Sequence, residues 1–307
     1  MPRPLDIWRC AIVKGTTEEI LRDGIDPGAI LWLPDMPPCA FRADPFGLWR
    51  DGRLHVFAEA FDYRTRIGHI DVLVYDEALM LLETRSVLRT PWHLSYPFVF
   101  EAEGETWMLP EAYKSGTLTL YRARAFPDHW EAVCQIPLDG PAIDATPFWH
   151  DGKWWLFYAP SADPLARRSH LHVAWSDTLT GPWHLHPLNP VRVDLASARP
   201  GGTAWLRDGA IILPVQDCRS TYGGAMRVLS IETLDETRFV ATDAAGPTAP
   251  GWMAPFNEGF HTLSSAGPVT LIDVKRTETS FYGETIRIRG VLRRRWREAR
   301  LLERLAG

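Results

Sequence analysis

A hairpin pattern recurs along the chain and restricts the possible folds more than any other feature. In its first copy Asp44 precedes a short apolar run, Asp51-Gly52 forms a turn, and a second apolar run ends at Glu59. Asp-Gly pairs readily adopt the positive backbone dihedral angles that a two-residue hairpin turn requires. The pattern therefore predicts a β-hairpin with an acidic residue at its open end.

Later copies keep the spacing of the first. Tyr96 lies eight residues before Gly104, and Asp144 lies eight residues before Gly152, the same distance as in the first copy. Two looser copies follow. Between 48 and 58 residues separate consecutive turn glycines, which are Gly52, Gly104, Gly152, Gly209 and Gly267. A period of about 50 residues built from strands is typical of a β-propeller with one four-stranded blade per repeat.

The alternative fold is an ordinary β-sandwich, which also contains regular turns but does not require a constant distance from a polar residue to the turn. We therefore predict an all-β, five-bladed β-propeller that occupies residues 1–307 as a single domain. The expected blades are residues 41–90, 91–140, 141–193, 194–245 and 246–291. We expect Ile7–Val13 to close the ring by pairing near residues 285–291, because closure removes the exposed sheet edges.

Charge and composition exclude several classes of function. The formal net charge is −5, and a nucleic-acid-binding surface needs clustered positive charge, so we expect no nucleic-acid partner. The one basic run, residues 287–300, is interpreted as a final strand and a short amphipathic helix with a solvated face, with lipid or acidic-partner contact as the alternative. The sequence has no signal-peptide pattern and no membrane-span window, which predicts a cytoplasmic protein.

The cysteines and histidines do not have the spacing of metal ligands. The four cysteines, Cys10, Cys39, Cys134 and Cys218, are far apart, so we expect free thiols. The ten histidines are also scattered, and we predict no catalytic metal and no other cofactor. Fourteen tryptophans are enough both to pack the blades and to form the apolar walls of a sugar site.

Polar residues at the repeated positions are expected to meet at one site. The innermost strand of each propeller blade begins near the central axis, so residues about 50 positions apart in sequence converge there. The predicted neighbours at the strand entrances are Asp44, Tyr96, Asp144, Arg199 and His261. Glu59 and Glu111 occupy a second repeated position, seven residues after the turn glycine, and His93 and Lys114 are further candidates for ligand contacts.

Carboxylates in different environments are suited to acid and base catalysis, because burial raises the pKa of one group while an arginine lowers that of another. An aspartate at a blade entrance can also serve only to accept backbone N–H groups. Both interpretations apply to each carboxylate of the predicted site.

Short motifs resemble glycoside hydrolase family 43 and related five-bladed propeller glycosidases. They are Ala43-Asp44-Pro45-Phe46, the segment from Ile143 to Trp149 followed by Asp151-Gly152, and Ser176–Trp183. The chain as a whole, with Arg199-Pro200-Gly201-Gly202 and Gly259-Phe260-His261-Thr262, resembles still more the N-terminal propeller domain of glucosamine inositolphosphorylceramide transferases and related bacterial proteins.

The resemblance to family 43 implies roles for two aspartates. Asp44 matches the general base of the first blade, and Asp144 matches the residue that tunes the acid and orients the sugar. Where the family has a Glu-Gly-Pro acid motif, this chain has Arg199-Pro200-Gly201-Gly202. Either Glu111 supplies the proton from another blade, or hydrolysis is absent. The two resulting hypotheses are a glycosidase or transglycosidase acting on a furanoside or small pyranoside, and a non-hydrolytic glycan-recognition module of polysaccharide or glycolipid assembly.

Overall fold

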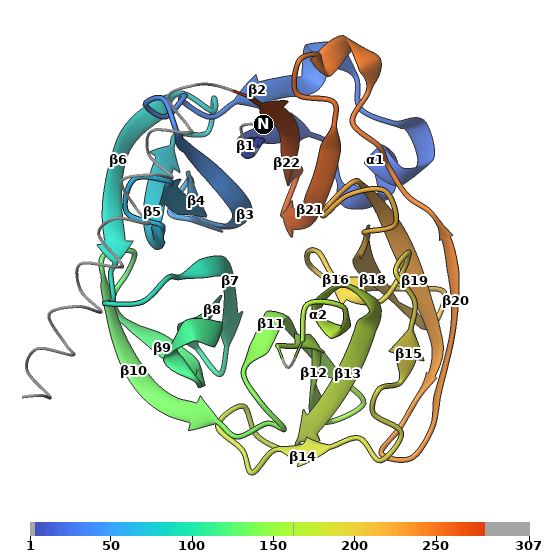
Figure 1. Cartoon of the computed structure of the whole chain (residues 1–307). Helices are drawn as coiled ribbons and strands as arrows, with labels where there is room; N and C mark the ends of the chain where they lie inside the picture. The colour runs from blue at the N-terminus through green and yellow to red at the C-terminus, as the bar shows by residue number, and fades with distance from the viewer. Residues whose placement is uncertain (1–3, 162, 280–307) are drawn as a thin grey trace, which may run out of the picture.

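The structure is a computed structural model that describes residues 4–161 and 163–279. Five antiparallel sheets are arranged around a central axis, so the predicted all-β, five-bladed propeller is confirmed (Figure 1). The helices are short and lie between the strands; they are α1 (Thr17–Asp23), α2 (Ala166–Ser169) and the 3-10 turns η1 (Pro27–Ala29), η2 (Tyr113–Ser115) and η3 (Gly251–Met253). Within the described residues, none of the helices has the length and apolar character needed to cross a bilayer.

Four blades are each built from one continuous segment, with the first strand nearest the axis. Blades 1 and 2 contain β3 (Ala40–Arg50), β4 (Arg53–Asp62), β5 (Ile67–Tyr75), β6 (Leu81–Leu88), β7 (Ser95–Ala102), β8 (Glu105–Glu111), β9 (Leu118–Ala125) and β10 (His129–Ile136). Blades 3 and 4 contain β11 (Ala142–His150), β12 (Lys153–Pro160), β13 (His170–Ser176), β14 (His184–Leu185), β15 (Arg192–Val193), β16 (Arg199–Pro200), β17 (Trp205–Arg207), β18 (Ala210–Asp217), β19 (Ala225–Leu234) and β20 (Phe239–Ala245).

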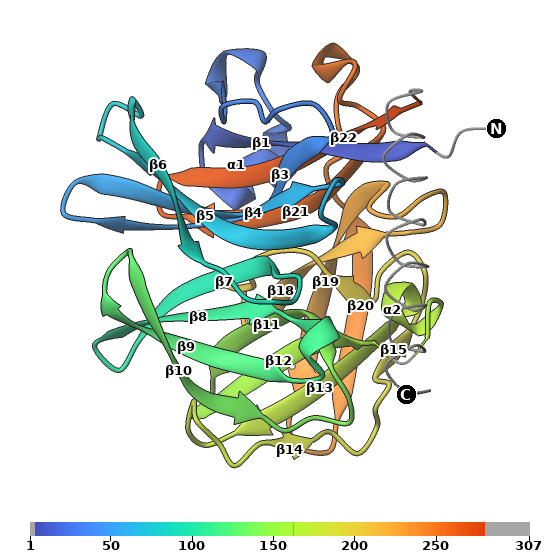
Figure 2. The same cartoon turned by 60° about the vertical axis from the view of Figure 1, so that its left-hand side comes forward.

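The fifth blade combines segments from both ends of the described chain. Its inner strands are β21 (Gly259–Ala266) and β22 (Val269–Glu278), and its outer strands are β1 (Leu5–Lys14) and β2 (Ile30–Trp32). β1 pairs with β22 over its whole length, and Figure 2 shows the two strands side by side. The expected closing strand, Ile7–Val13, lies within β1, but the predicted partner was wrong, because Ile7 to Val13 pair with Arg276 to Thr270 of β22, the next strand of the same hairpin as β21. Residues 285–291 and the basic run, residues 287–300, lie outside the described residues.

Local backbone geometry explains the constant distance of eight residues. Asp44, Tyr96 and Asp144 have φ angles of 51°, 44° and 50°, and the pairing register shifts at each of them, so each lies in a β-bulge. At the other end of the hairpin, the residue before the turn glycine also has a positive φ in the first four blades. Two positive φ angles in a two-residue turn match the right-handed twist of the hairpin strands. The repeated distance therefore measures the strand between a bulge and a turn.

Apolar side chains fill the spaces between neighbouring blades. Each of five buried clusters joins residues of two adjacent blades; Phe46 and Phe98, for example, belong to the cluster between blades 1 and 2. Trp107 and Trp154 fill the next interface. The four cysteines are free thiols, as expected. Because every interface is closed by packing, the inner strands are held in fixed positions around the axis.

Candidate functional site

A cavity of about 330 Å³ lies at the axis, on the side where the innermost strands begin. Seven of the nine predicted site residues line it: Asp44, Glu59, His93, Glu111, Asp144, Arg199 and His261. We refer to this cavity as the axial pocket. The structure therefore brings together carboxylates, an arginine and two histidines from segments more than 200 residues apart.

Two predicted residues do not line the axial pocket. Tyr96 is fully buried, and its hydroxyl group lies 2.9 Å from the Thr146 hydroxyl and accepts the N–H of Gly202 at 2.7 Å. Lys114 is exposed in η2. Tyr96 still contributes to the site through its backbone, because its N–H donates to the Asp44 carboxylate at 3.2 Å.

The bulged residues link neighbouring blades through backbone hydrogen bonds to carboxylates. The N–H of Asp44 donates to Asp273 at 2.8 Å, that of Tyr96 donates to Asp44, and that of Asp144 donates to Glu111 at 3.4 Å. A positive φ turns each N–H out of the regular ladder and toward the carboxylate of the preceding blade. The bulges thus position the acids as well as the strands.

Asp44 is a buried carboxyl group with few partners. It accepts hydrogen bonds from the Tyr96 N–H and from the Thr262 hydroxyl, the latter at 3.1 Å, and its nearest cationic group is His261 at 3.7 Å. Burial raises the pKa of Asp44 to about 6, although His261 opposes this effect. Asp44 therefore changes protonation state close to neutral pH and can accept a proton there.

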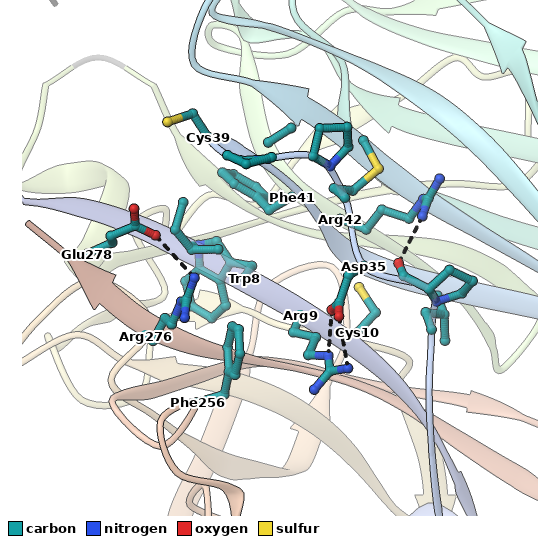
Figure 3. A pocket seen from close by; sticks show the side chains of 17 residues that line it. Trp8, Arg9, Cys10, Asp35, Cys39, Phe41, Arg42, Phe256, Arg276 and Glu278 are labelled. Atoms are coloured by element: carbon teal, nitrogen blue, oxygen red, sulfur yellow. Dashed lines mark hydrogen bonds and ion pairs between the residues drawn. The ribbon is translucent and has the colours of Figure 1, made fainter. Parts of the chain in front are cut away.

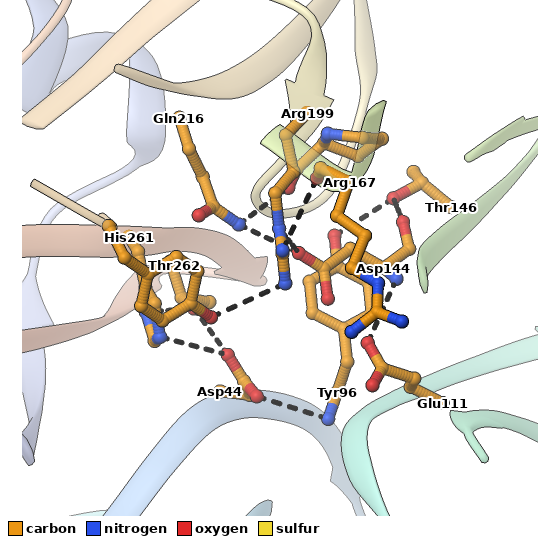
Figure 4. Close-up of polar contacts among 12 residues, drawn as sticks. Asp44, Tyr96, Glu111, Asp144, Thr146, Arg167, Arg199, Gln216, His261 and Thr262 are labelled. Carbon is orange, nitrogen blue, oxygen red and sulfur yellow. Dashed lines mark hydrogen bonds and ion pairs between the residues drawn. The ribbon is translucent and has the colours of Figure 1, made fainter. Parts of the chain in front are cut away.

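His261 is held by Asp273 and by a tryptophan from β1. Its Nδ1 lies 2.7 Å from the Asp273 carboxylate, and the Trp8 ring stacks on it with centroids 3.6 Å apart (Figure 4 shows His261 beside Asp44). Burial acts to lower the pKa of His261, but the carboxylates of Asp273 and Asp44 outweigh it and raise the pKa above its ordinary value. An imidazolium facing Asp44 is the favoured state.

Asp144 is fixed from two sides. Arg199 Nε donates to its Oδ2 at 2.6 Å and Gln216 Nε2 donates to the same oxygen at 2.7 Å, as Figure 4 shows. The Arg199 guanidinium also lies 4.8 Å from the ring centroid of Tyr222. Because the ion pair is buried and two partners hold the Asp144 carboxylate, Asp144 is suited to orienting a ligand or its neighbours.

Glu111 and Glu59 have environments that favour the neutral form. Burial, followed by the Asp144 carboxylate, raises the pKa of Glu111 well above its usual range, and Arg199 opposes this in part. Burial, followed by Asp44 and Glu111, raises the pKa of Glu59 in the same way. Its neighbour His93 lies 3.6 Å away and accepts the Gly68 N–H at Nδ1. Burial and Lys114 lower the pKa of His93 to about 4, so this histidine is neutral.

One group of residues in the described part of the chain has the geometry of a metal site. Asp44, His261 and Asp273 place one potential ligand atom each within 4.8 Å of one another. Both carboxylates of this group already accept backbone N–H groups, and His261 is bonded to one of them. The three side chains therefore form a hydrogen-bonded network without an ion. The absence of a catalytic metal stays a prediction.

Several site residues were not predicted, and the repeat could have indicated one of them. Gln216 lies seven residues after Gly209, the position that Glu59 and Glu111 occupy in their own repeats, whereas Asp273 lies six residues after Gly267. Gln216 and Asp273 hold residues of the axial pocket without lining it, whereas four residues that do line it lie outside the repeated positions: Trp8, Tyr113, Arg167 and Tyr222. No spacing rule identifies these four, because they come from the closing strand and from connections between strands.

The sequence matches known proteins over most of its length. A family model described as glucosamine inositolphosphorylceramide transferase 1, N-terminal, matches residues 34–246. The chain is 35% identical over 206 residues to glucosamine inositolphosphorylceramide transferase 1 of Oryza sativa subsp. indica, and 34% identical over 206 residues to that of Arabidopsis thaliana. These matches cover 66% of this chain but 28% and 27% of the two relatives, so the chain spans less than a third of their length.

Solved structures share the fold at low sequence identity. A family 117 glycoside hydrolase from Zobellia galactanivorans has a TM-score of 0.56 and 13% identity, covering 90% of this chain and 91% of its own. The catalytic domain of a family 62 α-L-arabinofuranosidase from Coprinopsis cinerea has a TM-score of 0.55 and 12% identity, covering 78% of this chain and 92% of its own. At these identities the likeness shows the fold alone.

Proposed function

Because the chain belongs to the family of glucosamine inositolphosphorylceramide transferase 1 N-terminal domains, we propose that its axial pocket binds a glycosyl unit and catalyses its hydrolysis or transfer. The family resemblance inferred from the sequence is thereby confirmed. One observation carries the proposal: two buried carboxyl groups with raised pKa values, Asp44 and Glu111, face the same cavity beside an arginine-bound aspartate.

In the proposed reaction Glu111 is the acid and Asp44 is the base. Glu111 gives its proton to the glycosidic oxygen as the bond from that oxygen to the anomeric carbon breaks. Asp44, ionised above about pH 6, takes a proton from the attacking hydroxyl group, which is water in hydrolysis and a sugar or lipid hydroxyl group in transfer. The cycle leaves Glu111 ionised and Asp44 protonated, and exchange of protons with water restores both groups.

Asp144 and the aromatic side chains bind and orient the sugar in this proposal. Arg199 and Gln216 both donate hydrogen bonds to Oδ2 of Asp144. In this proposal the second carboxylate oxygen, Oδ1, is the one that accepts a hydrogen bond from a sugar hydroxyl group. Phe61, Tyr63 and Tyr113 line the cavity, and flat rings suit the apolar C–H face of a sugar. A volume of about 330 Å³ is at the small end of ligand pockets and suits one or two sugar rings.

The second candidate function is recognition of a glycan without cleavage. Two observations favour it: Arg199 stands where the family 43 acid motif is expected, and the chain corresponds to less than a third of the named transferases. In that case the axial pocket holds a sugar, and the carboxyl groups serve as hydrogen-bond partners only. A glycosylated lipid headgroup of the kind named in the relatives is the first ligand to test.

The experiment is a screen of aryl furanosides and small aryl pyranosides for release of the aryl group. Asp44→Asn and Glu111→Gln are each expected to lower kcat by about 10²–10⁴-fold, the usual contribution of a general acid or base. Asp151→Asn is the matched control, because the Asp151 side chain is 84% exposed at a turn. Equal turnover by wild type and Asp44→Asn rules out the catalytic role of Asp44. A sugar that binds wild type but is never cleaved supports the second candidate.

A further inference from the structure

Tyr222 lines the axial pocket and has a hydroxyl hydrogen that no residue of the described structure accepts. It lies on the connection between β18 and β19. Its hydroxyl oxygen accepts a hydrogen bond from Nη2 of Arg199 at 3.3 Å. Because a guanidinium group can only donate, this bond uses a lone pair of the phenol and leaves the O–H free. A hydrogen-bond donor is therefore available to a ligand at the wall of the cavity.

The Arg199 guanidinium holds Tyr222 beside Asp144. Its Nε donates to Oδ2 of Asp144 at 2.6 Å, as Figure 4 shows, and its central carbon lies 4.8 Å from the ring centroid of Tyr222. Its Nη1 donates to the Arg167 carbonyl at 3.3 Å, so all three nitrogens of the planar group have partners. Since the guanidinium is rigid, it fixes the position of the Tyr222 hydroxyl group relative to the Asp144 carboxylate.

The phenol and the carboxylate have complementary hydrogen-bonding roles. Burial is the main cause that raises the pKa of Tyr222 well above its usual range; Arg199 opposes the rise and Asp144 adds to it, so the phenol keeps its hydrogen at neutral pH. The Asp144 carboxylate, in its ion pair with Arg199, only accepts hydrogen bonds. A sugar hydroxyl group both donates and accepts, so a single hydroxyl group can bond to both residues, whereas a C–H group can bond to neither.

A buried lysine of the fifth blade ties down the loop that carries Tyr222. Lys275, on β22, is 1% exposed, and its Nζ donates to the Tyr222 carbonyl at 2.8 Å and to the Thr221 hydroxyl at 3.1 Å. The Asp6 carboxylate lies 3.3 Å from the same Nζ. Complete burial of an ammonium group is unfavourable without such partners, so the ammonium group and the loop hold each other in place.

The next residue of the loop packs directly against the site. Gly223 has a φ angle of 58°, and a Cβ at this position would lie 2.7 Å from Cβ of His261. The Gly223 carbonyl accepts the N–H of Phe260 at 2.8 Å. The Tyr222 ring meets the His261 ring edge to face, with centroids 5.3 Å apart. The loop is therefore fixed to the fifth blade by its backbone as well as by Lys275.

We propose that Tyr222 is a specificity-determining residue of the axial pocket: its O–H donates to one sugar hydroxyl group, and that hydroxyl group donates to Asp144. Lys275 is the positioning residue that holds Tyr222 there. The inference rests on the proposed function and narrows its substrates to sugars with a free hydroxyl group at that ring position. A deoxy sugar leaves both the phenol and the carboxylate unpaired, and sites built to bond a hydroxyl group reject such analogues strongly.

The experiment is an NMR titration of the full chain with methyl furanosides and methyl pyranosides of the arabino, xylo, gluco and galacto series, and with the monodeoxy derivatives of each sugar that binds. Wild type is expected to bind one monodeoxy derivative at least about 30-fold more weakly than its parent. Tyr222→Phe keeps the ring and removes only the hydroxyl group, so it should weaken binding of the parent by about fivefold to tenfold and leave that derivative almost unchanged. Tyr121→Phe is the matched control, since Tyr121 lies on β9 and does not line the axial pocket.

A double-mutant cycle tests the role of Lys275. Lys275→Met should reduce the preference for the parent sugar over the deoxy derivative, and it should reduce it no further in the Tyr222→Phe background, because Lys275 acts through Tyr222. A purely structural role would instead weaken the binding of both sugars equally. Thr221→Val removes only one Lys275 contact and takes the place of Lys275→Met if urea unfolding shows that the latter does not fold.

The outcomes separate this inference from the proposed function. Sugar binding in which wild type and Tyr222→Phe show the same preference for parent over deoxy derivative overturns the inference and leaves the proposed function intact. Independent effects of Lys275→Met and Tyr222→Phe on that preference overturn the positioning role of Lys275. Absence of binding of every sugar in the panel to wild type contradicts the proposed function, and the inference with it.

Discussion

Replacement of Asp44 by asparagine should change how the stability of the protein depends on pH. The Asp44 carboxyl group is 6% exposed, and burial raises its pKa from 3.8 to about 6. Asparagine has the same shape, so its carbonyl oxygen can accept the Tyr96 N–H while its NH₂ group donates to the Thr262 hydroxyl. The substitution therefore removes a titration and keeps both contacts.

The size of the effect follows from the two pKa values. Folded Asp44 keeps its proton up to about pH 6, whereas the unfolded chain releases it near 3.8, so the folded state binds more protons between these pH values. Stability from this group is therefore complete below about pH 4 and is lost as the pH rises through 6. The difference corresponds to about 3 kcal/mol. Relative to wild type, Asp44→Asn should gain about this amount between pH 4 and pH 7.

Urea unfolding at each unit of pH from 4 to 8 measures the difference directly. Glu59, Glu111 and His261 titrate in both proteins, but the Asp44 charge also raises the pKa of each, so the figure of about 3 kcal/mol counts the Asp44 carboxyl group alone. Asp151→Asn, at an exposed turn, should run parallel to wild type at every pH. A constant difference between Asp44→Asn and wild type from pH 4 to pH 7 would refute the raised pKa and with it the assignment of Asp44 as a base that works near neutrality.

Three further experiments test the geometry around the axis. Asp273→Asn should lower the pKa of His261, because burial then acts without the adjacent carboxylate; an unchanged NMR titration of His261 contradicts this. Arg199→Met should cost about 3–5 kcal/mol in urea unfolding by leaving the buried Asp144 without its cation, and adding Asp144→Asn should recover part of the loss; additive losses contradict the pairing. Gly202→Ala should cost more than about 3 kcal/mol, since a Cβ there would lie 1.9 Å from the Leu263 carbonyl oxygen; near-wild-type unfolding contradicts this contact.

Residues at the repeated positions were the predictable part of the site. Asp44, Asp144, Glu59 and Glu111 reach one cavity because the distance from bulge to turn and from turn to strand end is fixed by the hairpin. The same rule extended to the fourth blade would have indicated Gln216, whereas Asp273 in the fifth blade lies one residue short of the repeated distance. Tyr96 shows the limit of the rule, because its backbone N–H enters the site while its side chain passes to Thr146 and Gly202.

Other features could not be read from spacing at all. Trp8 reaches His261 only because β1 pairs with β22, a strand more than 250 residues later in the chain. A second cavity, of about 400 Å³, likewise depends on β1, the Pro-rich connector before β3 and β22 meeting at one place (Figure 3). Contacts between such distant segments depend on the closure of the ring and on packing between blades, and no local pattern encodes them.

The sequence by itself determined the repeated hairpins, because positive φ angles at Asp-Gly turns and the alternation of apolar residues are local properties of the chain. From these it determined the number of blades and most of the polar residues that meet at the axis, although the side chains of Tyr96 and Lys114 lie elsewhere. The tertiary structure decided the protonation of the carboxyl groups and the partners of Asp144 and His261. Burial and the distances between charges exist only after the five blades have closed around one axis, and these two quantities set the chemistry of the site.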